Sequence, residues 1–223
     1  MKIAKYNQSC LLIETNNKRI LIDPGVIGYY DGLLNKWKNI DIILVTHKHQ
    51  DHCNKEAIEE IIKRDNSKLY ITDEIQKEFN FVKYNIIKEN NIIKEDNITI
   101  EVVHAIHGYL AGMREKGIEI KENVGYIIDD GKNRLYTTSD TIGFYNDYKC
   151  NILCMPFNGN GLTLGLIDGL SFIKSINPDL VLPIHTEHPN PIMNPNIKSL
   201  KEMLTQNNIN YEILDLEESI EIS

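Results

Sequence analysis

Histidines and one aspartate are concentrated in one short segment, Thr46 to His52. The segment reads Thr-His-Lys-His-Gln-Asp-His, so four metal-binding side chains fall within six residues. Imidazole and carboxylate groups suit zinc, iron or manganese. The whole chain has only seven histidines, and three of them lie here, so a solvent-exposed loop that contains them by chance is a poor explanation. The segment predicts a metal site with the ligand candidates His47, His49, Asp51 and His52.

Three further ligand candidates each follow a predicted strand. They are His107 after 98–103, Asp140 after 134–138 and His185 after 180–184. Functional residues often occupy such positions, because a rigid scaffold holds the loop at the end of a strand. Taken singly, each has an ordinary explanation: a surface histidine, a turn or helix-cap aspartate, and a buried histidine with satisfied hydrogen bonds. Together with the first cluster, the metal interpretation is favoured for all three.

The elements that must position these residues alternate between strands and helices. Two apolar runs, 10–14 and 19–23, flank the turn residues Asn16-Asn17 and predict a hairpin. The run 41–45, directly before the histidine cluster, is typical of a strand buried on both faces. Helices are expected over 54–63, near 74–79, and over 166–175 and 197–206, with strands over 68–72, 98–103, 124–128, 134–138, 150–155, 180–184 and 211–214. This mixture predicts an α/β layered fold, and no linker-like segment divides it, so we expect one domain, 1–223.

Length and charge restrict the function classes. The chain has 223 residues, enough for a sizeable core, and its 24 basic and 32 acidic residues leave a formal charge of −8. An acidic balance argues against nucleic acid and against an anionic membrane surface as partners. The sequence shows neither a signal peptide nor an apolar run of about 20 residues. We therefore expect a cytoplasmic protein with reduced cysteines and a small-molecule substrate; homo-oligomer formation stays open.

Several segments carry a resemblance to a known family. They are Ile22-Asp23-Pro24, the cluster His47 to His52, Ala105-Ile106-His107-Gly108, Tyr136 to Thr141, and Leu182-Pro183-Ile184-His185. The sequence resembles the metallo-β-lactamase superfamily, whose signature is His-x-His-x-Asp-His followed by a distant His, Asp and His. The resemblance extends from about residue 2 to about residue 215. It is strongest to the small single-domain metal-dependent hydrolases related to lactonase-like members, and implies an αββα sandwich.

The resemblance also implies a binuclear site with two divalent metal ions, zinc first, with manganese or iron as alternatives. It assigns two groups of ligands that share a bridging Asp140: His47, His49 and His107 for the first metal, and Asp51, His52 and His185 for the second. Asp51 and Asp140 are the catalytic candidates, because Asp51 would orient the metal-bound water and Asp140 would join the two ions. Asp23 corresponds to the aspartate that ends a strand beside the ligands in this family.

Other residues near the ligands keep two interpretations. His104 could compete with His107; the family pattern favours His107, which leaves His104 beside the site or in packing. His188 could reach the substrate or be an ordinary loop histidine. Cys53 could bind zinc as a thiolate or fill a small buried apolar position. The segment 107–123, with Gly108, Gly112 and Gly117, is expected to cover the site as a flap, where Arg114 and Lys116 either attract an anionic substrate or are plain exposed charges.

We therefore predict a metal-dependent hydrolase that uses a metal-activated hydroxide on a small-molecule ester, lactone, amide or phosphodiester. The alternative is a phosphodiesterase or nuclease of the same superfamily that acts on RNA, DNA or cyclic nucleotides. The net charge of −8 and the lack of an inserted arm weigh against that alternative. A non-catalytic metal-binding protein is disfavoured by the complete set of ligands.

Overall fold

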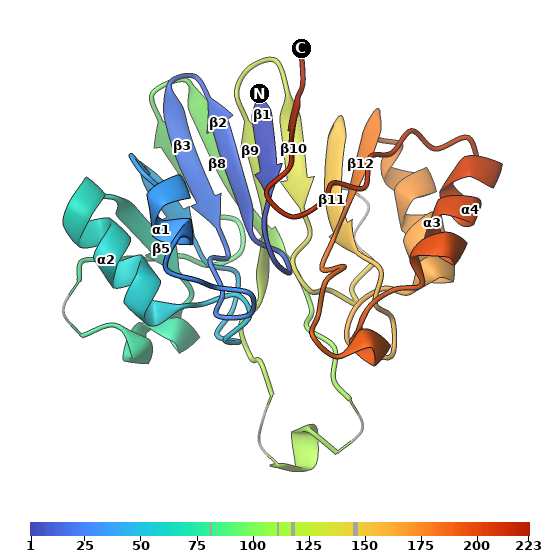
Figure 1. Ribbon diagram of the computed structural model, residues 1–223, viewed down its shortest axis with the longest axis horizontal. Helices are drawn as coiled ribbons and strands as arrows, with labels where there is room; N and C mark the ends of the chain where they lie inside the picture. The colour runs from blue at the N-terminus through green and yellow to red at the C-terminus, as the bar shows by residue number, and fades with distance from the viewer. Residues whose placement is uncertain (81, 111, 117–118, 145–146) are drawn as a thin grey trace. The chain divides into compact units, whose positions relative to one another are not determined.

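A computed structural model describes residues 1–80, 82–110, 112–116, 119–144 and 147–223, and only the backbone of Arg114 (Figure 1). The chain forms two compact units. Unit 1 consists of Met1–Lys88 together with Leu214–Ser223, and unit 2 consists of Glu89–Ile213. The chain thus passes from unit 1 into unit 2 at Glu89 and returns to unit 1 at Leu214. The single domain 1–223 stays a prediction.

Unit 1 contains a mixed sheet with the strand order β13-β1-β2-β3-β4-β5-β6. Its strands are β1 (Lys2–Lys5), β2 (Leu11–Thr15), β3 (Lys18–Ile22), β4 (Ile42–Leu44), β5 (Lys68–Ile71), β6 (Asn85–Ile86) and β13 (Ser219–Glu221). The strands from β13 to β3 pair antiparallel, and those from β3 to β6 pair parallel. The hairpin β2–β3 is confirmed; its turn residues Asn16 and Asn17 have φ 46° and 61°, as in a type I′ turn.

The helices of unit 1 are α1 (Leu33–Lys36), α2 (Lys55–Asp65) and a 3₁₀ turn, Asp73–Glu78. The predicted capping of α2 is confirmed, because Asn54 Oδ1 accepts from Ala57 N at 3.1 Å. The buried side chains of α2, among them Ile58 and Ile61, share one apolar cluster with Ile43 and Val45. The helix is thereby packed on the strand that leads into the histidine cluster.

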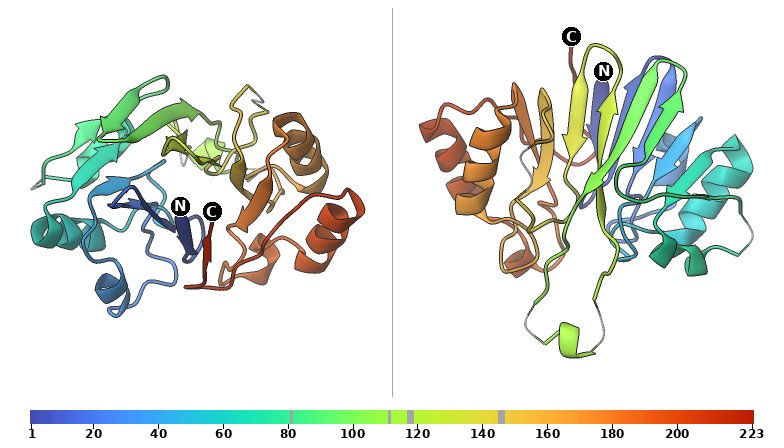
Figure 2. Two further views of the ribbon diagram at one scale, coloured as in Figure 1. Left: turned by 90° about the horizontal axis from the view of Figure 1, so that it is seen from above. Right: turned by 180° about the vertical axis from the view of Figure 1, so that it is seen from behind.

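Unit 2 contains a six-stranded sheet with the order β12-β11-β10-β9-β8-β7. Its elements are β7 (Ile92–Glu95), β8 (Ile98–His104), a 3₁₀ turn (Arg114–Lys116), β9 (Val124–Asp129), β10 (Arg134–Thr137), β11 (Ile152–Pro156), α3 (Leu166–Ile176), β12 (Leu180–Ile184), a 3₁₀ turn (Pro191–Met193) and α4 (Ile197–Gln206). The strands β7 to β10 pair antiparallel, and β10 to β12 pair parallel. The helices α3 and α4 lie side by side in all views (Figures 1 and 2). Phe172 and Leu200 on these helices pack with Leu153 and Val181 of the sheet.

The predicted strand over 211–214 is wrong. Only a single bridge, between Val181 and Tyr211, extends the edge of the sheet there. Leu214 is instead buried and Ile213 half-buried at the point where the chain leaves unit 2 for unit 1, and Leu214 O accepts from the Lys5 ammonium group at 3.1 Å. The short strands β1, β6, β7 and β13 were not expected, because their apolar patterns are too brief. The predicted α/β class agrees with these two mixed sheets and their helices.

Candidate metal centre

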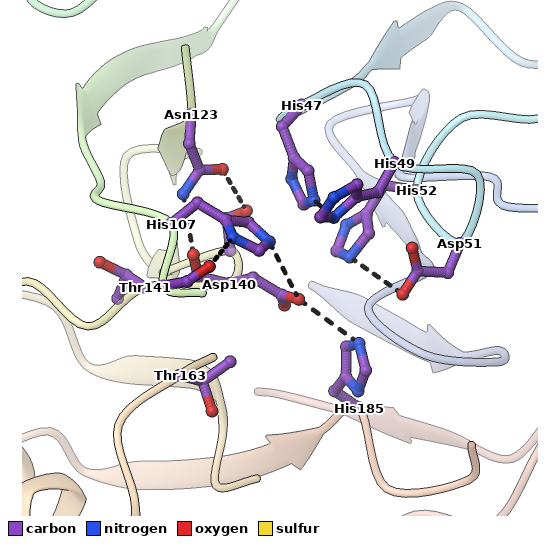
Figure 3. A network of polar contacts seen from close by, with 12 residues as sticks. His47, His49, Asp51, His52, His107, Asn123, Asp140, Thr141, Thr163 and His185 are labelled. Carbon is purple, nitrogen blue, oxygen red and sulfur yellow. Dashed lines mark hydrogen bonds and ion pairs between the residues drawn. The ribbon is translucent and has the colours of Figure 1, made fainter. Parts of the chain in front are cut away.

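The histidine cluster of unit 1 forms the loop that follows β4. Because β4 is fully buried and pairs parallel with β3 and β5, the loop begins at the carboxyl end of a rigid strand. His47 and His52 are buried, whereas His49 and Asp51 are half-buried. Figure 3 shows these four side chains side by side on this loop. One loop therefore presents four metal-binding groups at different depths.

Asp23 orients two of these histidines. Its carboxylate is buried and accepts three hydrogen bonds of 2.8 Å, from Thr46 N, Thr46 Oγ1 and His52 Nδ1. Burial raises the pKa of Asp23, and the hydrogen bonds from His52 and Thr46 oppose that rise. An ionised carboxylate only accepts, so His52 Nδ1 carries a proton and His52 Nε2 keeps its lone pair. Asp23 itself has φ 48°, a strained conformation that the surrounding contacts maintain.

Thr46 extends this arrangement to a second ring. Its hydroxyl donates to Asp23, so the same oxygen can accept from His47 Nδ1, which lies 3.0 Å away. His47 therefore also keeps the lone pair on Nε2. A partner that fixes the protonated nitrogen of a histidine is a common feature of metal-binding histidines, because it leaves the other nitrogen free to bind the ion.

The distances between donor atoms in unit 1 suit metal ligands. His47 Nε2 lies 3.1 Å from His49 Nδ1. Two nitrogens bound to one zinc ion, each at about 2.0–2.1 Å, lie roughly 3 Å apart. His52 Nε2 lies 3.7 Å from Asp51 Oδ2, which is longer than a hydrogen bond and close to the spacing of two ligands of a common ion. The donor types and their spacing both fit a transition metal.

Gly25 supports the cluster from the segment that follows β3. A Cβ atom at this position would lie 1.9 Å from the backbone oxygen of Asp51. The neighbouring backbone binds the same loop, with Val26 N donating to Gln50 O at 2.7 Å and Asn54 N donating to Pro24 O at 2.7 Å. Only a residue without a side chain allows this close approach.

We expect Gly25→Ala to displace Asp51 and to lower both stability and metal content. Overpacking against backbone costs about 1–3 kcal/mol. Thermal unfolding and bound zinc per chain measure the two effects. Gly165→Ala is the matched control, because its Cβ would make an ordinary contact of 3.6 Å. Equal melting temperatures and metal contents in the two variants would contradict the supporting role of Gly25.

Unit 2 brings its three ligand candidates together. His107, Asp140 and His185 are all buried, and each follows a strand as predicted. Asp140 Oδ2 lies 3.4 Å from His185 Nε2 and 3.9 Å from His107 Nε2 (Figure 3). His107 Nδ1 donates to Gly108 O at 2.6 Å, so its Nε2 presents a lone pair toward Asp140. One carboxylate thus lies between two imidazoles, an arrangement suited to a carboxylate that bridges metal ions.

Two asparagines that were not predicted from the sequence hold these ligands in place. Asn123 Nδ2 donates to Asp140 O, and Asn123 Oδ1 accepts from Ser139 Oγ, both at 2.9 Å. Asn158 Nδ2 donates to His185 O at 3.0 Å and lies 3.2 Å from His185 Nδ1. Ser139 and His185 have φ 57° and 59°, so these contacts also maintain strained backbone. Their positions at strand ends were the only signal in the sequence, and it is weak.

The remaining candidates have other contacts. His104 Nδ1 lies 2.5 Å from Glu89 Oε2, which agrees with a position outside the ligand set. His188 Nδ1 accepts from Asn190 N at 3.0 Å, which favours an ordinary loop histidine. Cys53 is buried, and burial raises the pKa of its thiol to about 12, so a neutral, apolar role is favoured.

The expected flap joins β8 to β9 in unit 2. Figure 1 shows this green segment extending beyond the ends of these two strands. Lys116 is exposed, whereas Gly117 and the Arg114 side chain lie outside the described residues. That the segment covers the site, or that its charges attract a substrate, stays a prediction.

The sequence matches the β-lactamase superfamily domain over residues 2–185. The chain belongs to the metallo-β-lactamase superfamily. Among its relatives, a UPF0173 metal-dependent hydrolase from Nanoarchaeum equitans is 25% identical over the full length of both chains. Another, from Korarchaeum cryptofilum, is 27% identical over 97% of this chain and 96% of the relative.

Solved structures show the same metallo-β-lactamase fold. A metal-dependent hydrolase from Parabacteroides distasonis has a TM-score of 0.77 and 26% identity, covering 96% of this chain and 92% of that one. A metallo hydrolase from Ignicoccus hospitalis has a TM-score of 0.79 and 19% identity, and the match covers 100% of this chain and 99% of that one. The predicted family and fold class are confirmed, and the chain stands among the metal-dependent hydrolases of the metallo-β-lactamase superfamily. Within the described residues, no helix is long and apolar enough to span a bilayer.

Proposed function

We propose that the ligands of the two units form one binuclear metal site that hydrolyses a small-molecule ester, lactone, amide or phosphodiester. The first ion would be held by His47, His49 and His107, and the second by Asp51, His52 and His185, with Asp140 shared between them. Residues 1–223 would then act as one domain, because each unit contributes only part of the site.

The observation that carries this proposal is the buried Asp23 carboxylate, which accepts from His52 Nδ1 directly and orients His47 through the Thr46 hydroxyl. A fold that needed only a satisfied buried histidine would not require two rings with their Nε2 atoms prepared as acceptors. In unit 2, the backbone bond from His107 Nδ1 has the same consequence. Two separate contacts, the Asp23–Thr46 pair in unit 1 and Gly108 O in unit 2, thus hold three imidazoles in the tautomer that a cation requires.

The carboxylates and the imidazoles among the proposed ligands would have different roles. Divalent ions, when bound, supply Lewis acidity and lower the pKa of a water molecule, so that hydroxide is available as the nucleophile at neutral pH. Asp51 and Asp140 are the carboxylates of the set and offset part of the positive charge. Asp51 is half-buried, so its carboxylate can accept a hydrogen bond from the attacking water and orient it. Imidazoles that bind through a lone pair would add no negative charge, so the ions would remain strongly electrophilic.

A small-molecule substrate is part of the proposal. Nucleic acid would require a basic surface, whereas the chain carries a net charge of −8. A cytoplasmic location also belongs to the proposal, and the free, buried Cys10, Cys53, Cys150 and Cys154 suit a reducing compartment.

Metal analysis and a substrate panel test the proposal. Protein produced with zinc, manganese or iron is expected to retain about two ions per chain, and to hydrolyse at least one lactone, ester, amide or phosphodiester. Chelation should abolish the activity, and the added ion should restore it. Less than half an ion per chain under every condition would contradict the binuclear site, and activity that survives complete metal removal would contradict the mechanism.

A further inference from the structure

Unit 2 contains a cavity of about 420 Å³ beside one of the proposed ligands. Residues of two chain segments, 104–109 and 119–123, line it together with Ile142. His107 and Asn123 form part of the wall, so the cavity adjoins one proposed ligand and the residue that donates to Asp140 O. Its volume is in the range of small-molecule binding pockets.

Apolar side chains are exposed at this cavity. Ile106 directly precedes His107 and is 41% exposed, and Ile142 follows Asp140 by two residues and is 43% exposed. A backbone bond joins the two isoleucines, since Ile142 N donates to Ile106 O at 2.8 Å, and Ile106 N also donates to the Thr141 side chain, at Oγ1, at 3.0 Å. Exposed apolar groups in a concave site with a few polar neighbours are typical of ligand binding.

The wall also carries charge, but in balanced form. Glu119 and Lys121 both line the cavity, so its formal charges cancel. A site for a phosphate or a nucleotide would instead concentrate donors and positive charge. The cavity therefore suits an uncharged, apolar group.

We propose that this cavity binds the apolar acyl group of an ester or lactone substrate beside the scissile bond. This inference rests on the proposed function, because it takes His107 as a ligand of the reactive centre. The isoleucines would select substrates by chain length, and Asn123 would tie the cavity wall to Asp140. The protein would then prefer acyl esters and alkyl lactones to phosphodiesters.

A chain-length series tests the inference. The substrates are the 4-nitrophenyl esters from acetate to octanoate, assayed with metal-replete protein. Because each buried methylene favours binding by about 0.8 kcal/mol, kcat/KM is expected to rise about fourfold per added methylene until the cavity is filled. Ile142→Ser and Ile106→Ser should flatten this dependence on chain length. Ile167→Ser is the control, because Ile167 is 82% exposed on α3 and does not line the cavity.

Binding of the product acid gives a second readout that needs no turnover. Hexanoate should bind more tightly than acetate, and Ile142→Ser should remove that difference. Equal kcat/KM for all esters, or an unchanged dependence in both serine variants, would overturn the inference while the hydrolase activity stood. If no ester is hydrolysed but the hexanoate preference exists and depends on Ile142, the cavity is supported and the ester form of the proposed function fails. If no ester is hydrolysed and hexanoate binds no more tightly than acetate, both the assignment of the cavity and the ester form of the proposed function are overturned.

Discussion

Asp140→Asn is expected to reduce bound metal from about two ions per chain to one or fewer, and to lower kcat/KM by more than about 100-fold. Asp140 Oδ2 faces His107 Nε2 and His185 Nε2 at 3.9 Å and 3.4 Å. An amide has nearly the same shape but no charge, so it cannot offset two cations. Losing a ligand should cost more than losing a residue that only orients one, for which 10–100-fold is usual.

The measurements are metal content by mass spectrometry, kcat/KM on the best substrate of the panel, and the melting temperature of the metal-free protein. His49→Ala should also lower metal content and kcat/KM, because it removes a proposed ligand. His49 is half-buried, so the loss of its side chain leaves no large cavity. Asp168→Asn is the matched control, since Asp168 is an exposed aspartate in the first turn of α3. An Asp140→Asn protein that keeps two ions and full activity would rule out the bridging role.

Asp23→Asn is expected to weaken zinc binding about 10–100-fold although every proposed ligand remains. The carboxylate accepts on both oxygens, from Thr46 N on one side and from Thr46 Oγ1 and His52 Nδ1 on the other. An amide offers one acceptor and one donor. It either places its NH₂ against Thr46 N–H or forces His52 into the tautomer that cannot bind the ion through Nε2.

Competition with a chelator measures the zinc Kd, and nitrogen NMR of the metal-free protein reports the tautomer of His52. Leaving a buried donor unsatisfied should also cost about 1–3 kcal/mol of stability. Asp41→Asn is the control for that loss, because Asp41 accepts from Arg19 N at 2.9 Å in the same unit but away from the histidines. If Asp23→Asn and Asp41→Asn bind zinc equally well, Asp23 does not orient the ligands.

Much of the secondary structure of this protein follows from the local pattern of apolar, turn and capping residues. The hairpin around Asn16-Asn17, the buried strand β4 and the capped helix α2 depend on neighbouring residues, and they were predicted. The ligand candidates could also be found, because imidazole and carboxylate groups at strand ends are uncommon together and their chemistry is distinctive. The family match over residues 2–185 agrees with these local signals.

Tertiary contacts decided the rest. The contact of Asp23 with Thr46 and that of Asn123 with Asp140 each join residues that lie beside different strands. Nothing in a single segment distinguishes such a Thr or Asn from an ordinary loop residue. The strand expected over 211–214 failed for the related reason that a strand needs a partner along its length, and here only Tyr211 has one.

The sequence alone therefore determined which groups can bind metal, since that follows from side-chain chemistry. Only the tertiary structure decided which nitrogen of His47 and His52 carries the lone pair, and that Ile106 and Ile142 meet at one cavity. The physical reason is that a tautomer and a cavity are properties of neighbours in space, and these neighbours are brought together only when the sheets form.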